Sequence, residues 1–149
     1  MKRFPFLLIL WLAATMSAIA LPRKYAQALD IAKAQAEKIG TQVNEASSRR
    51  VMKKIRKADA SEITQPYFVF ENAEGKGFTI VSGDDLMPEI LGYTLQGQLS
   101  DGEMSPQFAW YLEQCEETAK AVANADPHVL RELAEARTFQ QQATLTTPI

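Results

Sequence analysis

The sequence predicts an α+β fold in which an antiparallel sheet of three to four strands packs with an N-terminal helix and C-terminal helices. Three observations support this prediction. Apolar residues follow a helical spacing in 22–39, two runs rich in aromatic and β-branched residues flank a glycine-containing link at 72–77, and helical spacing returns after Gly97. Helices and strands therefore occupy separate parts of the chain, which is the α+β order.

The first 20 residues have the features of an export signal. Lys2 and Arg3 precede an apolar run, and Ala18 and Ala20 supply the small residues that signal peptidase requires. We predict cleavage after Ala20 and a mature chain that is periplasmic or secreted, without stable membrane association. The alternative is a retained membrane anchor, although the apolar segment 4–21 is at the short limit of a spanning helix.

Composition limits the chemistry that the mature chain can perform. The 149 residues include 16 basic and 18 acidic side chains, and loss of Lys2 and Arg3 with the signal leaves 14 basic ones, so the formal charge changes from -2 to -4. One histidine and one cysteine exclude a Cys/His zinc cluster, a multi-histidine metal site and an internal disulfide. We expect no metal, no cofactor and one domain over 21–139, followed by a polar, flexible tail at 140–149.

The mature chain opens with a predicted helix over 22–39. Pro22 suits the first turn of a helix, and Gly40 suits a C-terminal cap. The expected buried stripe consists of Leu29, Ala32, Ala36 and Ile39. The segment that follows is ambiguous, because 51–55 fits an edge strand guarded by lysines and also fits a short second helix.

A dense basic run overlaps this ambiguous segment. It consists of Arg49, Arg50, Lys53, Lys54, Arg56 and Lys57. Its sharpest interpretation is an anion or nucleic-acid patch, but no aromatic residue lies among the cations and the mature chain is acidic overall. A solvated helix or strand face is favoured. If the run binds a ligand, an acidic protein outside the cytoplasm suits an exported chain better than DNA.

The sheet is predicted from three runs. Residues 67–70 and 78–81 flank the polar link 72–77 and form a hairpin, and a third run at 89–95 follows the turn-forming residues 82–85. These runs give an antiparallel sheet of at least three strands.

Two further helices are predicted after the sheet. Ser105 is a candidate N-cap with Pro106 in the first turn, and Asp126 begins a second helix. The first stripe consists of Phe108, Tyr111, Leu112, Cys115, Ala119 and Val122, and the second of Leu130, Leu133 and Ala134.

No catalytic residue is predicted. Cys115 and His128 are the only possible thiol–imidazole pair, but Cys115 lies on an apolar stripe, where burial makes a thiol inert, and His128 begins a different helix. Asp84 and Asp85 are expected to shape a turn rather than bind a metal. The Gly75–Gly77 loop precedes a strand, so it is not a phosphate cradle. We therefore expect a protein that is not an enzyme.

The region 67–97 closely resembles the prosegment of streptopain-type cysteine proteases, a domain that also occurs as the separate Spi protease inhibitor. The residues that carry the resemblance are Gly77, Phe78, Ile80, Val81, Ser82, Gly83, Asp84, Asp85, Pro88, Glu89, Ile90, Leu91, Gly92 and Tyr93. The flanking helical patterns at 22–39 and 106–122 extend it over most of the mature chain. Six of these residues are expected to fill the core, namely Phe78, Ile80, Val81, Ile90, Leu91 and Tyr93.

The resemblance implies an α+β prosegment fold that keeps a cognate protease inactive by covering its cleft. In such zymogens a papain-like catalytic domain follows, and this sequence ends before one could begin. The leading interpretation is an exported inhibitor that binds a streptopain-like cysteine protease in trans. Two alternatives are a remnant or fragment of a protease precursor, and a surface interaction module that uses the basic face at 49–57.

A loop between the last strand and the helix at Pro106 is the candidate protease-contact segment. It consists of Asp101, Gly102, Glu103, Met104 and Ser105. The resemblance suggests that Met104 enters a substrate pocket, although related prosegments tend to have asparagine where Glu103 stands. The alternative is an ordinary strand-to-helix connection.

Overall fold

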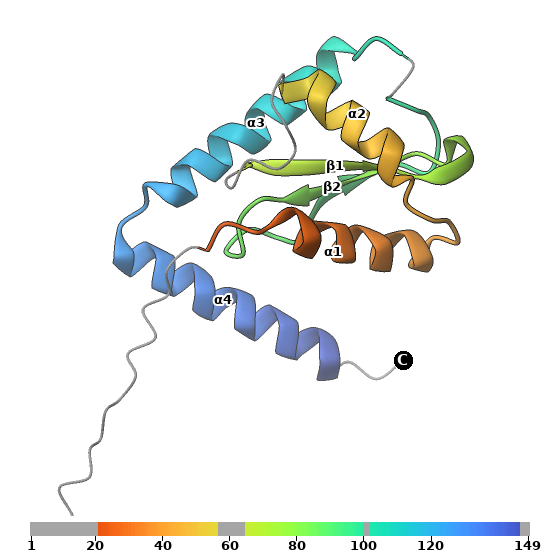
Figure 1. Ribbon diagram of the computed structural model, residues 1–149. Helices are drawn as coiled ribbons and strands as arrows, with labels where there is room; N and C mark the ends of the chain where they lie inside the picture. The colour runs from red at the N-terminus through yellow and green to blue at the C-terminus, as the bar shows by residue number, and fades with distance from the viewer. Residues whose placement is uncertain (1–20, 57–64, 100–101, 147–149) are drawn as a thin grey trace, which may run out of the picture.

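The computed structural model describes residues 21–56, 65–99 and 102–146, with side chains for all of these except Arg56 and residues 138–146. Within these residues an antiparallel three-stranded sheet is surrounded by helices (Figure 1), which confirms the α+β prediction. The elements are α1 (Tyr25–Lys38), α2 (Glu45–Arg56), β1 (Tyr67–Glu71), β2 (Phe78–Ser82), β3 (Ile90–Tyr93), α3 (Pro106–Ala123) and α4 (Pro127–Thr146). None of the described helices is long and apolar enough to cross a membrane.

The sheet has the order β1-β2-β3, with both neighbouring pairs antiparallel. The predicted hairpin is confirmed, with Tyr67 opposite Ser82 and Glu71 opposite Phe78. A 3₁₀ turn over Ala73–Gly75 connects its strands. The pairing of β2 with β3 shifts register at Ile80/Val81, which is a bulge that bends the last strand.

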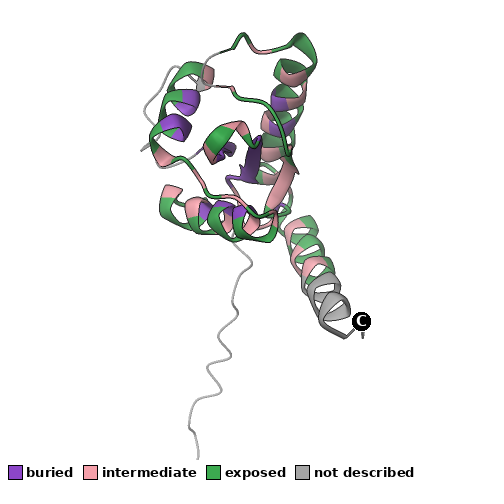
Figure 2. Ribbon diagram, turned by 90° about the vertical axis from the view of Figure 1, so that its right-hand side faces the viewer, coloured by how far each residue is buried: buried purple, intermediate pink, exposed green. Residues whose placement is uncertain are grey.

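Both faces of β1 and β2 are buried, which fits the mainly apolar sequences of these two strands. On one face, Tyr25 of α1 packs its ring against Phe68 and Phe70, with centroid separations of 6.0 and 5.6 Å. On the other face, Phe108 of α3 packs on Phe78 at 5.0 Å. The buried residues of α1, α2 and α3 accordingly lie on the parts of these helices nearest the sheet (Figure 2).

Helix α1 begins at Tyr25, three residues later than predicted. Pro22 instead forms a β-bridge with Asp84, and the short segment between Pro22 and α1 is extended. Of the predicted stripe, Ala32 and Ala36 are buried, whereas Leu29 and Ile39 are half-buried and Ala28 is the third buried residue. Gly40 has a φ of 72°, as its predicted capping role requires.

The ambiguous segment is helix α2, so the edge-strand interpretation is wrong. Its apolar and hydroxyl side chains seal the free edge of β1. The N–H of Val69 donates to Met52 Sδ at 3.1 Å, and the N–H of Glu71 donates to Ser48 Oγ at 2.9 Å. A strand at this position would instead pair with β1 through its backbone and would itself present a new free edge.

Helix α3 begins as predicted, with the Phe108 N–H donating to Ser105 Oγ at 3.2 Å. Helix α4 lies outside the body formed by the sheet and the other helices (Figure 1). Leu130 and Ala134 of α4 are half-buried as expected, whereas Leu133 is exposed because it lies to one side of that stripe. The α4 backbone continues to Thr146, into the segment expected to be a polar tail.

We predict that Gly83→Ala strongly destabilises the fold. A Cβ at this position would lie 1.5 Å from the carbonyl oxygen of Gln65, so the backbone must move. The free energy of unfolding should fall by about 3 kcal/mol or more, measured by urea denaturation. In the matched control Gly102→Ala, the nearest atom is the Gln98 oxygen at 3.8 Å, and the free energy should change by less than about 0.5 kcal/mol. Equal stability of the two variants would contradict the prediction.

Candidate functional site

The turn at 82–85 receives the extended segment that precedes α1. The Arg23 N–H donates to the Gly83 oxygen at 2.7 Å, and the Arg23 guanidinium donates to the carbonyl oxygens of Ser82 at 2.6 Å and Asp84 at 3.0 Å. The guanidinium also contacts the Ser82 hydroxyl. Arg23 is only 6% exposed, and this burial lowers its pKa. The segment therefore joins the turn through a buried cation and its hydrogen bonds.

The two aspartates of this turn accept hydrogen bonds from backbone N–H groups, in line with the predicted turn role. Asp84 Oδ1 accepts from the N–H of Leu86 at 2.8 Å, and Asp85 Oδ1 accepts from the N–H of Leu21 at 3.0 Å. Partial burial is the main cause that raises the pKa of Asp84. Among the described residues, no group of three or more His, Cys, Asp or Glu side chains could hold a metal ion.

The other residues of the resemblance mostly serve the core. Phe78, Ile80 and Val81 are buried, and Ile90 and Leu91 are half-buried. Pro88 and Glu89 are exposed.

The prediction that Tyr93 fills the core is wrong, because its exposed fraction is 52%. Gly92 faces α3, where a Cβ would lie 3.3 Å from the Tyr111 hydroxyl oxygen. Because side chains alternate along a strand, Tyr93 points to the opposite face, at the end of an edge strand. Gly77 has a φ of 79°, and a Cβ there would lie 2.1 Å from the Thr94 oxygen, so this position requires glycine.

The candidate contact loop is exposed at its described tip and anchored at its ends. Gly102, Glu103 and Ser105 are exposed, while Met104 is half-buried and packs against the hydrophobic core. Asp101 lies outside the described residues. The structure therefore uses Met104 partly to support the loop.

Two side chains that the sequence analysis did not single out for this loop hold Gly102 within it and Leu99 before it. Lys54 Nζ of α2 donates to the Gly102 oxygen and to the Leu99 oxygen, the latter at 3.4 Å. The Leu99 N–H donates to Glu71 Oε1 at 2.5 Å. The sequence offered one signal for the role of Glu71, since it is a charged residue at the end of the apolar strand YFVFE. Its partners could not be predicted because they are distant in sequence.

Glu71 links three parts of the fold. It is 1% exposed, and its second carboxylate oxygen accepts from the Ser47 hydroxyl of α2. Its own backbone oxygen accepts from the Asn44 N–H at 2.8 Å. A buried carboxylate needs such donors, and these come from α2 and the loop, so the loop position depends on α2.

The thiol and imidazole behave as the sequence indicated. Cys115 is 7% exposed, and desolvation raises the pKa of its thiol, with its hydrogen bond to Tyr111 acting in the opposite direction. His128 is exposed on α4, with Nδ1 3.5 Å from Glu132 Oε1. Cys115 is therefore a buried apolar residue of α3 rather than a nucleophile.

Comparison with known proteins assigns this arrangement to a family. The sequence model of the Spi protease inhibitor family matches residues 18–119, which include α1, α2, the whole described sheet and most of α3. The chain belongs to the Spi protease inhibitor family. The Spi match thus covers the anchored loop and the turn at 82–85, and it ends before α4.

One curated relative of this Spi domain is the thiol protease/hemagglutinin PrtT of Porphyromonas gingivalis. It is 28% identical over 83 residues, which are 56% of this chain and 10% of that protein. The Spi chain therefore spans about a tenth of the length of this relative. No solved structure matches the chain.

We predict that Arg23→Met destabilises the Spi domain. The variant leaves the Ser82 and Asp84 carbonyl oxygens without their buried donor, so the free energy of unfolding should fall by about 2–3 kcal/mol in urea denaturation. Lys24→Met, at the adjacent exposed position, is the matched control and should change it by less than about 0.5 kcal/mol. An Arg23 variant as stable as this control would show that the buried cation contributes nothing.

We also predict that Lys54→Met loosens the loop without unfolding the domain. Hydrogen exchange of the Leu99 amide, which donates to Glu71 Oε1, should accelerate, because the Leu99 and Gly102 carbonyl groups lose their donor from α2. Lys53→Met changes a neighbouring exposed lysine and should leave this exchange unchanged. Identical exchange in the two variants would mean that Lys54 does not hold the loop.

Proposed function

We propose that the chain is an exported inhibitor of a streptopain-like cysteine protease and that it covers the active-site cleft of that enzyme. The observation that carries this proposal is the Spi match over 18–119, which spans the sheet and the helices packed on it. The name of the relative, a thiol protease, supports a cysteine protease as the target. Export rests on the signal-like residues 1–20, with cleavage after Ala20 and a periplasmic or extracellular product.

The contact loop would act as a preorganised plug. A protease–inhibitor interface typically buries about 800 Å² on each partner, and a few central groups supply most of its affinity. Lys54 holds the carbonyl group of Gly102 and Glu71 holds the preceding Leu99, so these described residues would lose little freedom on binding. In this proposal Gly102 and Glu103 reach the cleft, and the half-buried Met104 supports them and contributes its exposed part.

Inhibition of this kind requires no reaction by the inhibitor. Burial raises the pKa of the Cys115 thiol, so the amount of nucleophilic thiolate at neutral pH is small. We propose accordingly that the chain needs neither catalytic residues nor a cofactor. Its effect on the protease depends on the surface that it covers.

A second candidate function is that of a prosegment that acts on a protease domain of the same precursor. The specific observation in its favour is that the matched relative is a much longer thiol protease, of which the alignment covers 10%. The same fold could then assist folding of the protease domain as well as block it. A protease reading frame directly after this one would favour this function.

The first function predicts stoichiometric inhibition in trans. The exported chain, residues 21–149, is titrated into the streptopain-like protease of the same organism while hydrolysis of a peptide substrate is followed. Activity should fall linearly to near zero at equimolar inhibitor. Cys115→Ala is the control for a thiol-dependent effect and should inhibit equally.

Full protease activity at micromolar excess of the chain would contradict inhibition in trans. A refolding assay then tests the second function. Denatured protease that regains activity faster when the chain is present would support the prosegment role, whereas an unchanged refolding rate would count against it.

A further inference from the structure

Basic side chains dominate the exposed face of α2. Its only acid, Glu45, forms an ion pair with Lys33 of α1 at 2.8 Å. The opposite face is buried against the sheet and consists of Ser47, Ser48, Val51 and Met52. The exposed charged residues with described side chains are Arg49, Arg50, Lys53 and Lys54.

Half of this charge, on Arg50 and Lys53, is not used by the fold. Arg49 lies over the Tyr25 ring at 5.8 Å, and Lys54 binds loop carbonyl groups. For Arg50 and Lys53, no ion pair is formed within 21–56, 65–99 and 102–137. The formal charge of the chain without residues 1–20 is -4, so a local cluster of unpaired cations opposes the overall charge.

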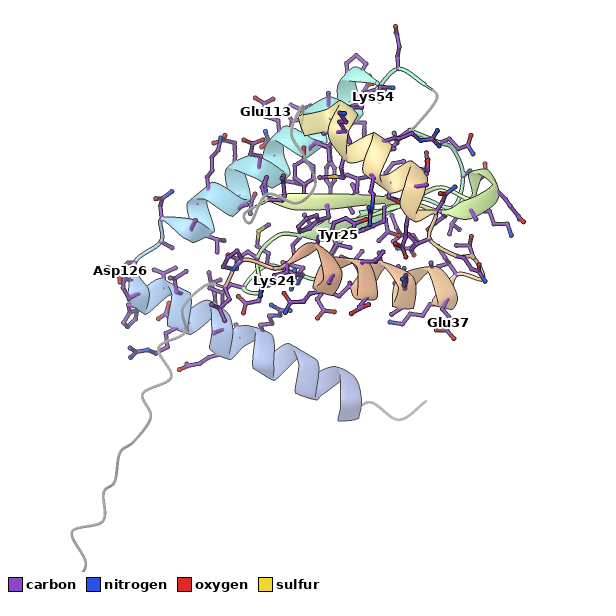
Figure 3. The ribbon with its side chains drawn as sticks, viewed as in Figure 1. Lys24, Tyr25, Glu37, Lys54, Glu113 and Asp126 are labelled. Carbon is purple, nitrogen blue, oxygen red and sulfur yellow. The ribbon has the colours of Figure 1, made fainter. Side chains whose placement is uncertain are left out.

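This basic face adjoins the contact loop. Lys54 touches Gly102, and Arg50 lies four residues earlier on the same side of α2, one helical turn away. Figure 3 shows Lys54 on α2 near the start of α3, whereas Lys24 lies with α1, away from them. The loop and the basic face therefore form one continuous surface.

We propose that this basic face is a second part of the protease-contact surface and that it fits a cysteine protease with an acidic rim beside its cleft. The inference rests on the proposed inhibitory function and specifies the chemistry of its partner. Complementary charges at an interface rim mainly accelerate association. A nucleic acid is disfavoured as the ligand because no aromatic side chain on the exposed face of α2 is available for base stacking.

The double variant Arg50→Glu/Lys53→Glu tests this proposal in the exported chain. Association with the protease is measured from progress curves of inhibition at about 0.01 M and about 1 M ionic strength, where the Debye lengths are about 30 and about 3 Å. At low ionic strength the association rate constant should fall by about tenfold or more, and at high ionic strength it should match wild type. The dissociation rate constant should change little.

Lys24→Glu/Arg131→Glu is the matched control, with the same change of charge at exposed positions on α1's N-cap and on α4. Its association rate constant should stay within about twofold of wild type at low ionic strength. A circular dichroism melt of each variant shows that the fold is retained. A wild-type chain that does not inhibit would remove the proposed function and this inference with it.

Two outcomes would overturn this inference alone. One is an inhibitory wild-type chain whose Arg50→Glu/Lys53→Glu variant associates at the wild-type rate at low ionic strength. The other is a fluorescent oligonucleotide that binds wild type but not the double variant, while inhibition is equal in both. That result would assign the basic face to nucleic acid.

Discussion

Side chains from the helices close both outer edges of the described sheet, and this constraint positions the surfaces that the protein presents. The β1 edge is closed by Ser48 and Met52 of α2, which accept from strand N–H groups. At the β3 edge, the Tyr111 hydroxyl of α3 donates to the Leu91 oxygen at 2.5 Å. Open edges would pair with other chains, so each helix must lie where it can supply these groups.

The position of α2 in turn fixes the candidate loop. Glu71 ends β1 and joins the hydroxyl of Ser47 to the backbone of Leu99, and Lys54 reaches the loop from the next turns of the same helix. Edge closure, loop anchoring and the basic surface are therefore three consequences of one packed helix. An inhibitor benefits from such an arrangement because a loop ordered before binding loses less entropy on binding.

The elements that sequence predicts correctly are those with local signals. The hairpin follows from aromatic and β-branched runs, and the start of α3 follows from Ser105 and Pro106. The sequence could not decide α2, because its stripe fits two periods, and only the side chains that satisfy the β1 edge favour a helix. Tyr93 was wrongly predicted to be buried because aromatic residues in strands usually are, whereas β3 is an edge strand of the sheet.

The anchoring residues had no local signal. Arg23 donates to the Ser82 oxygen across a sequence separation of 59 residues, and Lys54 donates to the Gly102 oxygen across 48 residues. A single sequence contains no information on which distant carbonyl group a cation will contact. The sequence therefore offered no reason to treat Arg23 and Lys54 as anything but surface charges. The contact loop itself was proposed with the help of the family resemblance. The structure shows which residues hold it, namely Lys54 at Gly102 and the core contacts of Met104.

Enclosure of Cys115 has a consequence for how the protein would meet a thiol protease. An accessible sulfur could form a mixed disulfide with the enzyme or cross-link two copies of the chain under oxidising conditions. Cys115 is the single cysteine of the sequence and is buried on α3's apolar face, where burial restricts access to its sulfur and raises the pKa of its thiol. Any complex that the folded chain forms would then be held without sulfur exchange and would dissociate on dilution.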